Sequence, residues 1–76
     1  MTSGDMNRAD YEAAIYQWIM GRNAERDRYL LSLYLLDGLS YRQMQTRLVA
    51  MGYDELTEDR LKKIIRKRKA QLFSHI

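Results

Sequence analysis

Seven of the ten residues from Arg60 to Lys69 carry a positive side chain, and no acidic residue lies between Lys62 and Lys69. Like charges four positions apart in a helix repel, as those of Lys62 and Arg66 would, whereas Glu-Lys pairs at that spacing add stability. A surface selected only for solubility would mix the two signs. The run is therefore typical of a helix that binds a polyanion, and the solvated face of an ordinary surface helix is the simpler alternative.

A nucleic acid is the polyanion we expect, because each neutralised phosphate releases counterions and arginine matches the edge of guanine. A membrane surface is an alternative, but a helix lying on lipid needs a free apolar face. At about 100° per residue, the aliphatic side chains of this segment form one stripe that we expect to fill the core, namely Leu61, Ile64, Ile65 and Leu72. Arg68 projects near that stripe, so we expect its stem to pack against the domain, and a phosphate contact is the alternative.

Other kinds of chemistry are poorly represented in the chain. Four acidic residues are candidates for acid-base catalysis or for a Mg²⁺ site: Asp54, Glu55, Glu58 and Asp59. Their occurrence is already explained by a solvent-exposed loop and by the favourable interaction of acids with the positive start of a helix. The chain has no cysteine and its one histidine is His75, so neither a Cys/His metal site nor a Ser-His-Asp triad is expected. We therefore expect no catalytic residue, no metal ligand, no cofactor and no enzymatic activity.

Length and composition predict one small folded domain. The chain has 76 residues, 46% of them hydrophobic, which is too many for a disordered segment. No apolar run is long enough to span a bilayer and residues 1–5 do not resemble a secretory signal, so we expect a cytoplasmic protein without a membrane partner. Residues 1–39 carry four arginines against six acidic residues, whereas residues 40–76 carry nine basic against four acidic residues. This asymmetry indicates a polyanionic partner for the second half.

Four helices are expected to position these side chains, because proline is absent and helix-favouring residues predominate. Gly21, Gly38 and Gly52 each follow an apolar-periodic run, where a left-handed residue commonly ends a helix. The expected helices cover about residues 8–20, 23–37, 41–51 and 58–74. We predict a disordered N-terminus at residues 1–6 and, at residues 7–76, a compact all-α domain of four helices.

The helix starts are the best-specified points. Ser40 and Gln43 form a capping box for the third helix, and Thr57 is the expected cap of the fourth. Met44, Leu48 and Met51 are expected to point inward from the third helix.

Most aromatic residues belong to the first two helices and should lie in the core, leaving an exposed remnant such as Tyr16 or Trp18 for another protein or a homodimer. A stacking platform for single-stranded RNA would need aromatic residues interleaved with the basic ones. Along the chain the two kinds are segregated, with only Tyr41, Tyr53 and Phe73 in the basic half.

The segments DGLSYRQMQTRL and LTEDRLKKIIRKRKAQL together resemble the helix-turn-helix of the promoter-reading C-terminal region of bacterial sigma factors, and of small phage and mobile-element regulators built on it. In that family a leucine-rich helix ends in a Gly-Leu-Ser/Thr-Tyr turn, a first helix follows, and a basic recognition helix closes the domain. The corresponding residues are Leu35, Leu36, Asp37, Gly38, Leu39, Ser40, Tyr41, Met44, Leu48, Leu61, Ile64, Ile65 and Leu72. Two features depart from the pattern: Gln45 stands where a small residue is usual, and the turn from Val49 to Thr57 exceeds the usual length of about 3–4 residues.

The resemblance implies a transcriptional regulator that binds double-stranded DNA through a helix-turn-helix with an extended turn. It assigns base-edge contacts chiefly to Arg60, Lys63 and Lys67, and phosphate contacts to Arg42, Arg47, Lys62, Arg66 and Lys69. The alternative is a protein-binding module, such as a sigma-like phage or plasmid factor that docks on RNA polymerase or another host protein. The first two helices would then provide a contact with RNA polymerase or with a second copy of the chain.

Overall fold

The computed structural model describes residues 7–75, which form an all-α fold of four α-helices with one π-helical segment. The elements are α1 (Arg8–Trp18), α2 (Ala24–Leu31), η1 (Ser32–Leu36), α3 (Tyr41–Ala50) and α4 (Glu58–Phe73). The expected all-α fold with four helices is therefore confirmed. The N-terminus predicted to be disordered, residues 1–6, lies outside the described residues, as does Ile76.

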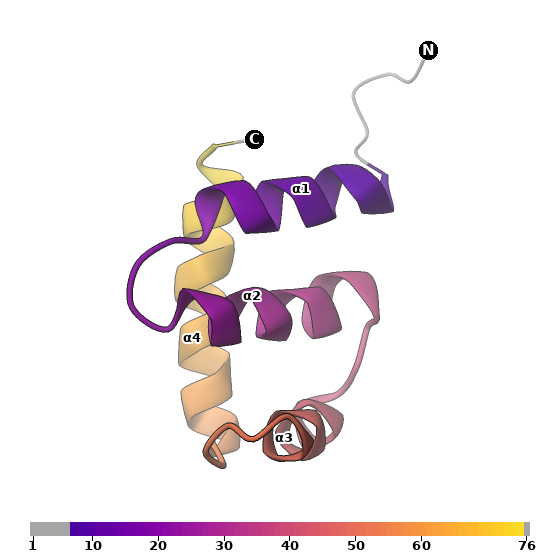
Figure 1. The fold of residues 1–76 in the computed structure, drawn as a ribbon, viewed down its shortest axis with the longest axis vertical. Coiled ribbons are helices and arrows are strands. Elements are labelled where there is room, and N and C mark those ends of the chain that lie inside the picture. Colours follow the sequence, from indigo (N-terminus) through magenta and orange to yellow (C-terminus); the bar gives the residue numbers. More distant parts are fainter. Residues whose placement is uncertain (1–6, 76) are drawn as a thin grey trace.

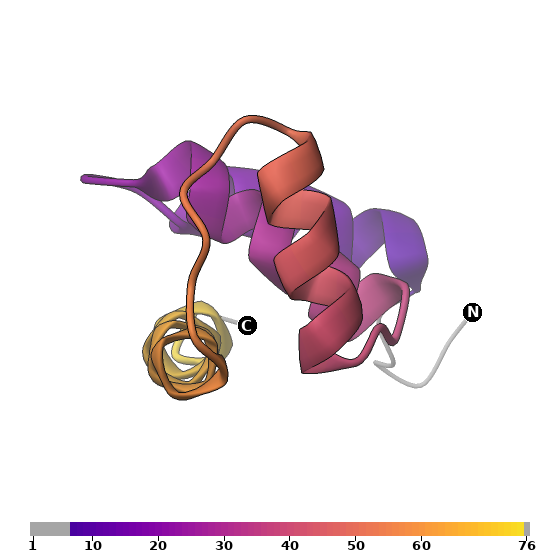
Figure 2. The ribbon, with the colours of Figure 1, turned by 90° about the horizontal axis from the view of Figure 1, so that it is seen from below.

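Helix α4 is the axis of the molecule. It runs along the longest dimension, and α1, α2 and α3 lie on one side of it and across its direction (Figure 1, Figure 2). All three of these helices contact α4. This arrangement leaves the opposite side of α4 open to solvent along its 16 residues, or about 24 Å at 1.5 Å per residue.

The core is aliphatic and draws on every helix. Its buried members are Ala14, Ile15, Ile19, Leu30, Leu31, Leu33, Met44, Leu48, Leu56, Leu61, Ile65 and Leu72. The predicted inward stripe of α4 is confirmed, with the half-buried Ile64 at its edge. The prediction for Met51 was wrong: its side chain is 61% exposed, because Met51 follows the last turn of α3 and no longer lies on the inward face.

The predicted helix caps are confirmed. The Ser40 hydroxyl accepts a hydrogen bond from the Gln43 backbone N–H, and the Gln43 side chain accepts one from the Ser40 backbone N–H. The Thr57 hydroxyl accepts a bond from the backbone N–H of Arg60 at the start of α4. At the other helix ends, Gly38 and Gly52 have φ of 65° and 90°, the left-handed region that a residue with a Cβ rarely adopts. These devices fix where α3 and α4 begin relative to the core.

The second helix differs from the expected continuous helix over residues 23–37. Regular α-helix ends at Leu31, and the next five residues form the π-helical segment η1. The Asp37 backbone N–H donates to the Ser32 carbonyl, five residues back, at 3.1 Å. The wider turn changes the direction in which the following side chains project, and such π-turns are frequent at functional sites. Tyr34 lies within this segment.

A buried ion pair joins α2 to α4. The Arg68 Nε donates to Asp27 Oδ2 at 2.7 Å, and both side chains are more than 90% buried. The remaining guanidinium nitrogens donate to the Met20 and Arg22 carbonyls and to the Gln71 side chain. Arg68 therefore does more than pack its stem: its head group holds the α1–α2 loop against α4. Asp27 is the buried partner of Arg68 and was not among the residues selected from the sequence.

The connection between α3 and α4 covers residues 51–57 and is held in place by Gln45. The Gln45 Nε2 donates to the Leu56 carbonyl at 2.8 Å, and Leu56 itself is buried in the core. The side chain that departs from the family pattern thus supplies a bond to the turn that also departs from it. In this chain the longer turn and the larger side chain form one structural unit.

Replacing Gln45 with alanine is expected to lower the free energy of unfolding by about 1 kcal/mol, because the half-buried Leu56 carbonyl loses its donor. Urea denaturation followed by circular dichroism measures the change. The control is Arg47→Ala on the exposed side of α3, expected to change stability by less than about 0.5 kcal/mol. A Gln45→Ala variant more stable than the wild type would mean that the turn prefers a closer approach of the two helices.

Candidate nucleic-acid interface

The basic residues of α4, apart from the buried Arg68, form two stripes on its solvent side. At about 100° per residue, each stripe spans about 60°, and the centres of the two stripes are about 120° apart. We call Lys62, Arg66 and Lys69 the tyrosine-side stripe, and Arg60, Lys63 and Lys67 the loop-side stripe. All six are exposed except Lys69, which is half-buried. The buried stripe of α4 occupies the third direction, so both basic stripes face away from the core.

The other two predicted site residues, Arg42 and Arg47, lie on a different element. Both are exposed on α3, and Arg42 borders a shallow cleft with Gln45, Thr46 and Glu55. No hydrogen bond or ion pair among residues 7–75 joins either arginine to α4. The structure thus brings six of the eight predicted site residues together on one helix and leaves two on the neighbouring one.

A cleft of about 210 Å³ adjoins the tyrosine-side stripe, and we call it the tyrosine cleft. Its lining residues are Tyr34, Tyr41, Lys62, Ile65, Arg66 and Lys69. The rings of Tyr34 and Tyr41 stack with their centroids 6.1 Å apart. The Lys62 ammonium lies 5.5 Å from the Tyr41 ring centroid, and the Lys69 ammonium 5.6 Å from that of Tyr34. Because each ring attracts the ammonium above it, the two tyrosines hold both lysines in place.

Folding therefore interleaves aromatic and basic residues that are segregated along the chain. Tyr34 comes from η1 and Tyr41 from the first turn of α3, whereas the lysines belong to α4. The segregation along the chain therefore does not carry over to the folded structure for these two tyrosines. The π-helical segment that carries Tyr34 has no known sequence signature, whereas Tyr41 follows directly after the capping residue Ser40.

One acid lies beside the tyrosine-side stripe. The Glu58 Oε2 is 3.0 Å from the Lys62 Nζ, in an exposed pair one helical turn apart. The hydrogen bond with Glu58 is the largest cause that raises the pKa of Lys62 above its usual value, so this lysine stays charged. Arg66 and Lys69 have no such partner among residues 7–75. The stripe keeps two uncompensated cations.

The phenol of Tyr41 remains protonated at neutral pH. Desolvation raises the pKa of Tyr41 above its usual value, and the neighbouring Tyr34 adds to the rise, while Lys62 acts in the opposite direction. A protonated phenol is a hydrogen-bond donor. The tyrosine cleft can therefore offer an anion both charged and neutral donors.

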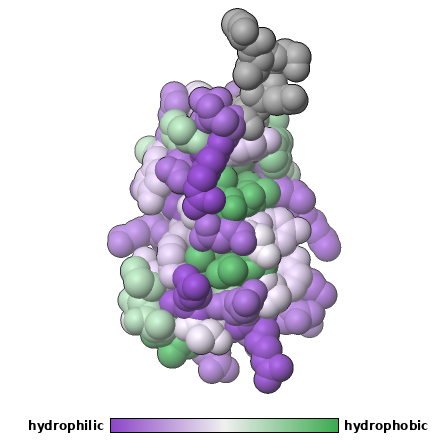
Figure 3. All heavy atoms as spheres, turned by 90° about the vertical axis from the view of Figure 1, so that its right-hand side faces the viewer, coloured by the Kyte–Doolittle hydropathy of each residue, from purple (hydrophilic) through white to green (hydrophobic). Residues whose placement is uncertain are grey.

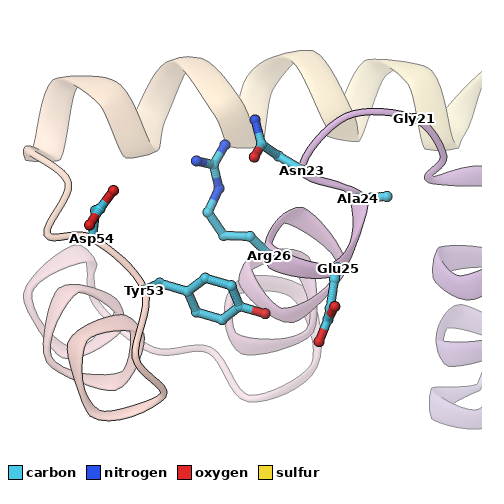
Figure 4. A pocket seen from close by; sticks show the side chains of 7 residues that line it. All are labelled: Gly21, Asn23, Ala24, Glu25, Arg26, Tyr53 and Asp54. Atoms are coloured by element: carbon cyan, nitrogen blue, oxygen red, sulfur yellow. The ribbon is translucent and has the colours of Figure 1, made fainter.

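A second, more open cleft of about 440 Å³ lies between the start of α2 and the α3–α4 connection (Figure 4). Glu25 and Asp54 line it together with Arg26 and Tyr53. Desolvation raises the pKa of Tyr53 above its usual value, and Glu25 adds to the rise. This mixture of signs suits neither a strong anion nor a cation, so the cleft is not the site that the α4 stripes would serve.

Exposed apolar side chains are scattered among polar ones. On the face shown in Figure 3, hydrophilic residues predominate and separate small hydrophobic patches. Tyr16 and Met20, near the end of α1, are 62% and 58% exposed, and the guanidinium of Arg28 lies 5.8 Å from the Tyr16 ring centroid. Trp18 is half-buried and stacks on His75 at 4.2 Å between ring centroids. Tyr16 and Trp18 were expected to be exposed and free to contact a partner, and of the two only Tyr16 is exposed.

Among residues 7–75, no three His, Cys, Asp or Glu side chains lie close enough together to hold a metal ion. In the same part of the chain, every helix is too short or too polar to span a bilayer. No family model matches this chain, and no curated protein or solved structure matches it either.

Proposed function

We propose that the protein is a small, non-enzymatic regulator of transcription that binds double-stranded DNA through α4. The observation that carries the proposal is the solvent side of α4, where six cationic side chains lie in two stripes and only Lys62 has an acidic partner among the described residues. Such a surface matches a backbone of phosphates, because each contact releases condensed counterions.

The position of α3 supports this function. It lies across the direction of α4 (Figure 2). The first turn of α3 carries Tyr41, which lines the tyrosine cleft together with the tyrosine-side stripe. In a helix-turn-helix the recognition helix enters the major groove while the preceding helix crosses the backbone. We propose this pose for α4 and α3, with Arg42 and Arg47 as further phosphate contacts from α3.

In this pose, the position of each basic residue around α4 determines whether it contacts a base edge or a phosphate. Lys63 lies near the middle of the exposed arc and is well placed to reach base edges, together with Arg60 in the first turn. Lys62, Arg66 and Lys69 line the tyrosine cleft and contact phosphates. Lysine and arginine bind phosphate as donors, but only arginine forms a rigid fork that fits guanine.

The test is binding of the unmodified protein to a mixed-sequence duplex, followed by fluorescence anisotropy between 50 and 200 mM salt, a range over which contacts with phosphate are resolved. A plot of log K against log salt should have a slope of about −3.6 or steeper, which corresponds to four or more contacted phosphates. Binding that does not weaken with salt, or no binding at 50 mM salt, would contradict the proposal.

The exposed Tyr16 and Met20 favour a second candidate, a protein-binding module that docks on RNA polymerase or forms a homodimer through α1 and α2. Tyr16 lies in the last turn of α1 and Met20 two residues after that helix, and neither belongs to the α4 stripes. Copurification of RNA polymerase after nuclease treatment, lost in a Tyr16→Ser/Met20→Ser variant, would support this candidate. The same variant should retain wild-type affinity for duplex DNA, because neither side chain is among the proposed DNA contacts.

A further inference from the structure

A basic cleft of about 200 Å³ lies on the other edge of α4 from the tyrosine cleft, and we call it the loop cleft. Its lining residues are Arg22, Asn23, Arg26, Asp27, Ile64, Lys67 and Arg68. The first four come from the α1–α2 loop and the start of α2, and the last three from α4. It therefore extends the loop-side stripe beyond α4 itself, onto residues that sequence reasoning did not select.

The one acid in the loop cleft is already fully engaged. Asp27 Oδ2 accepts from Arg68, and Asp27 Oδ1 accepts from the Arg26 Nε at 3.1 Å. Within residues 7–75, Arg22 and Lys67 take part in no ion pair. Four cationic side chains thus share a single carboxylate, and the charges of Arg22 and Lys67 remain uncompensated within the described residues.

Further hydrogen-bond donors lie in the same cleft. Asn23 has a left-handed backbone with φ of 61°, and its side chain makes no capping bond to α2. The side chains of Asn23 and Arg26 both point toward α4 (Figure 4). Arg26 uses its Nε and Nη2 on Asp27, which leaves Nη1 without a partner among the described residues. An amide and a guanidinium edge therefore accompany the free cations.

The two basic stripes lie around α4 at an angle that suits the two walls of a DNA groove. With its side chains an α-helix is about 10–12 Å across, and the B-DNA major groove is about 12 Å wide. The tyrosine-side and loop-side stripes lie about 120° apart around α4. A helix in the groove would therefore direct one stripe toward each strand. The tyrosine cleft serves the first strand, and the loop cleft continues the surface toward the second.

From this geometry we infer that Arg22, Arg26 and Lys67 bind a backbone phosphate of the second DNA strand. The inference rests on the proposed function and adds a phosphate site formed by the α1–α2 loop. Contacts with both strands explain how a small domain could prefer a duplex over a single strand. Base edges specify sequence, whereas paired phosphate contacts fix how deeply α4 enters the groove.

The test compares wild type with an Arg22→Gln/Lys67→Gln variant on a duplex and on one of its strands, by anisotropy over several salt concentrations. Arg26 is retained because it also bonds Asp27. The negative slope of the duplex plot should fall by about 1, and the duplex affinity roughly fivefold at 0.15 M salt, if one phosphate contact is lost. Affinity for the single strand should change less than about twofold, because the one phosphate backbone of a single strand lies along the tyrosine cleft and does not reach the loop cleft.

The matched control, Arg22→Lys/Lys67→Arg, keeps both charges and should bind the duplex like the wild type. Equal loss of affinity for duplex and single strand would overturn the inference, because the two residues would then serve the same strand. An unchanged duplex slope would overturn it as well, while normal binding by the wild type left the proposed function intact. If the wild type failed to bind any duplex, both the proposed function and this inference would fall.

Discussion

An Arg68→Met variant is expected to lose about 3 kcal/mol of unfolding free energy. Removing one partner of a buried ion pair costs about 3–5 kcal/mol, because the other charge stays buried without compensation. The lower end applies here, since Arg26 still bonds Asp27 Oδ1. Methionine preserves the apolar stem. Thermal unfolding should show a fall of more than about 12 °C in Tm, given about 4–8 °C per kcal/mol in a domain of this size.

A double variant separates the contribution of the charges to the unfolding free energy from the contribution of side-chain packing. Asp27→Leu/Arg68→Met removes both charges, and it should be more stable than Arg68→Met alone, because no unpaired carboxylate remains. The control is Lys69→Met on the next residue of α4, a half-buried lysine outside the ion pair. It should change the unfolding free energy by less than about 1 kcal/mol. Equal losses in Lys69→Met and Arg68→Met would contradict the role assigned to the Asp27–Arg68 pair.

The start of α3 could be predicted from the sequence, whereas the Asp27–Arg68 ion pair could not. The start of α3 could be predicted because both partners of its capping box, Ser40 and Gln43, lie within one helical turn, and a local signal needs no knowledge of the fold. Asp27 and Arg68 are 41 residues apart. Local patterns could place Asp27 in the first turn of a helix, but they could not pair it with a specific arginine.

The candidate site divides in the same way. The cationic positions of α4 and their exposure followed from periodicity alone, since one helix carries them all. The tyrosine cleft required contacts between η1, the first turn of α3 and α4, and one of its tyrosines projects from a π-turn. The loop cleft required the α1–α2 loop to lie against α4, an arrangement that Arg68 maintains. The two clefts form only where separate elements pack against one another, so they could not be predicted from the sequence.

The largest expected effect on binding belongs to a Lys62→Gln/Arg66→Gln/Lys69→Gln variant, which removes every cation of the tyrosine-side stripe. If each contacts one phosphate, the negative slope of log K against log salt should fall by about 2.7, and the duplex affinity at 0.15 M salt by roughly 100-fold. Loss of Lys62 also frees Glu58, whose carboxylate then repels the phosphates. Anisotropy with the same duplex measures both quantities, and circular dichroism checks that the helices persist.

A Tyr34→Phe/Tyr41→Phe variant isolates what the tyrosines add. Phenylalanine keeps the rings that attract the Lys62 and Lys69 ammonium groups, so the salt slope should stay near the wild-type value. Only the neutral hydroxyl donors are lost, and a hydrogen bond to a charged group contributes about 1.5–3 kcal/mol at most. A duplex affinity reduced at every salt concentration by the same factor would place a phenol on a phosphate.

If the Lys62→Gln/Arg66→Gln/Lys69→Gln variant kept the wild-type slope, DNA could not lie against this stripe, and the cations of α4 would have to be explained by an acidic protein surface instead.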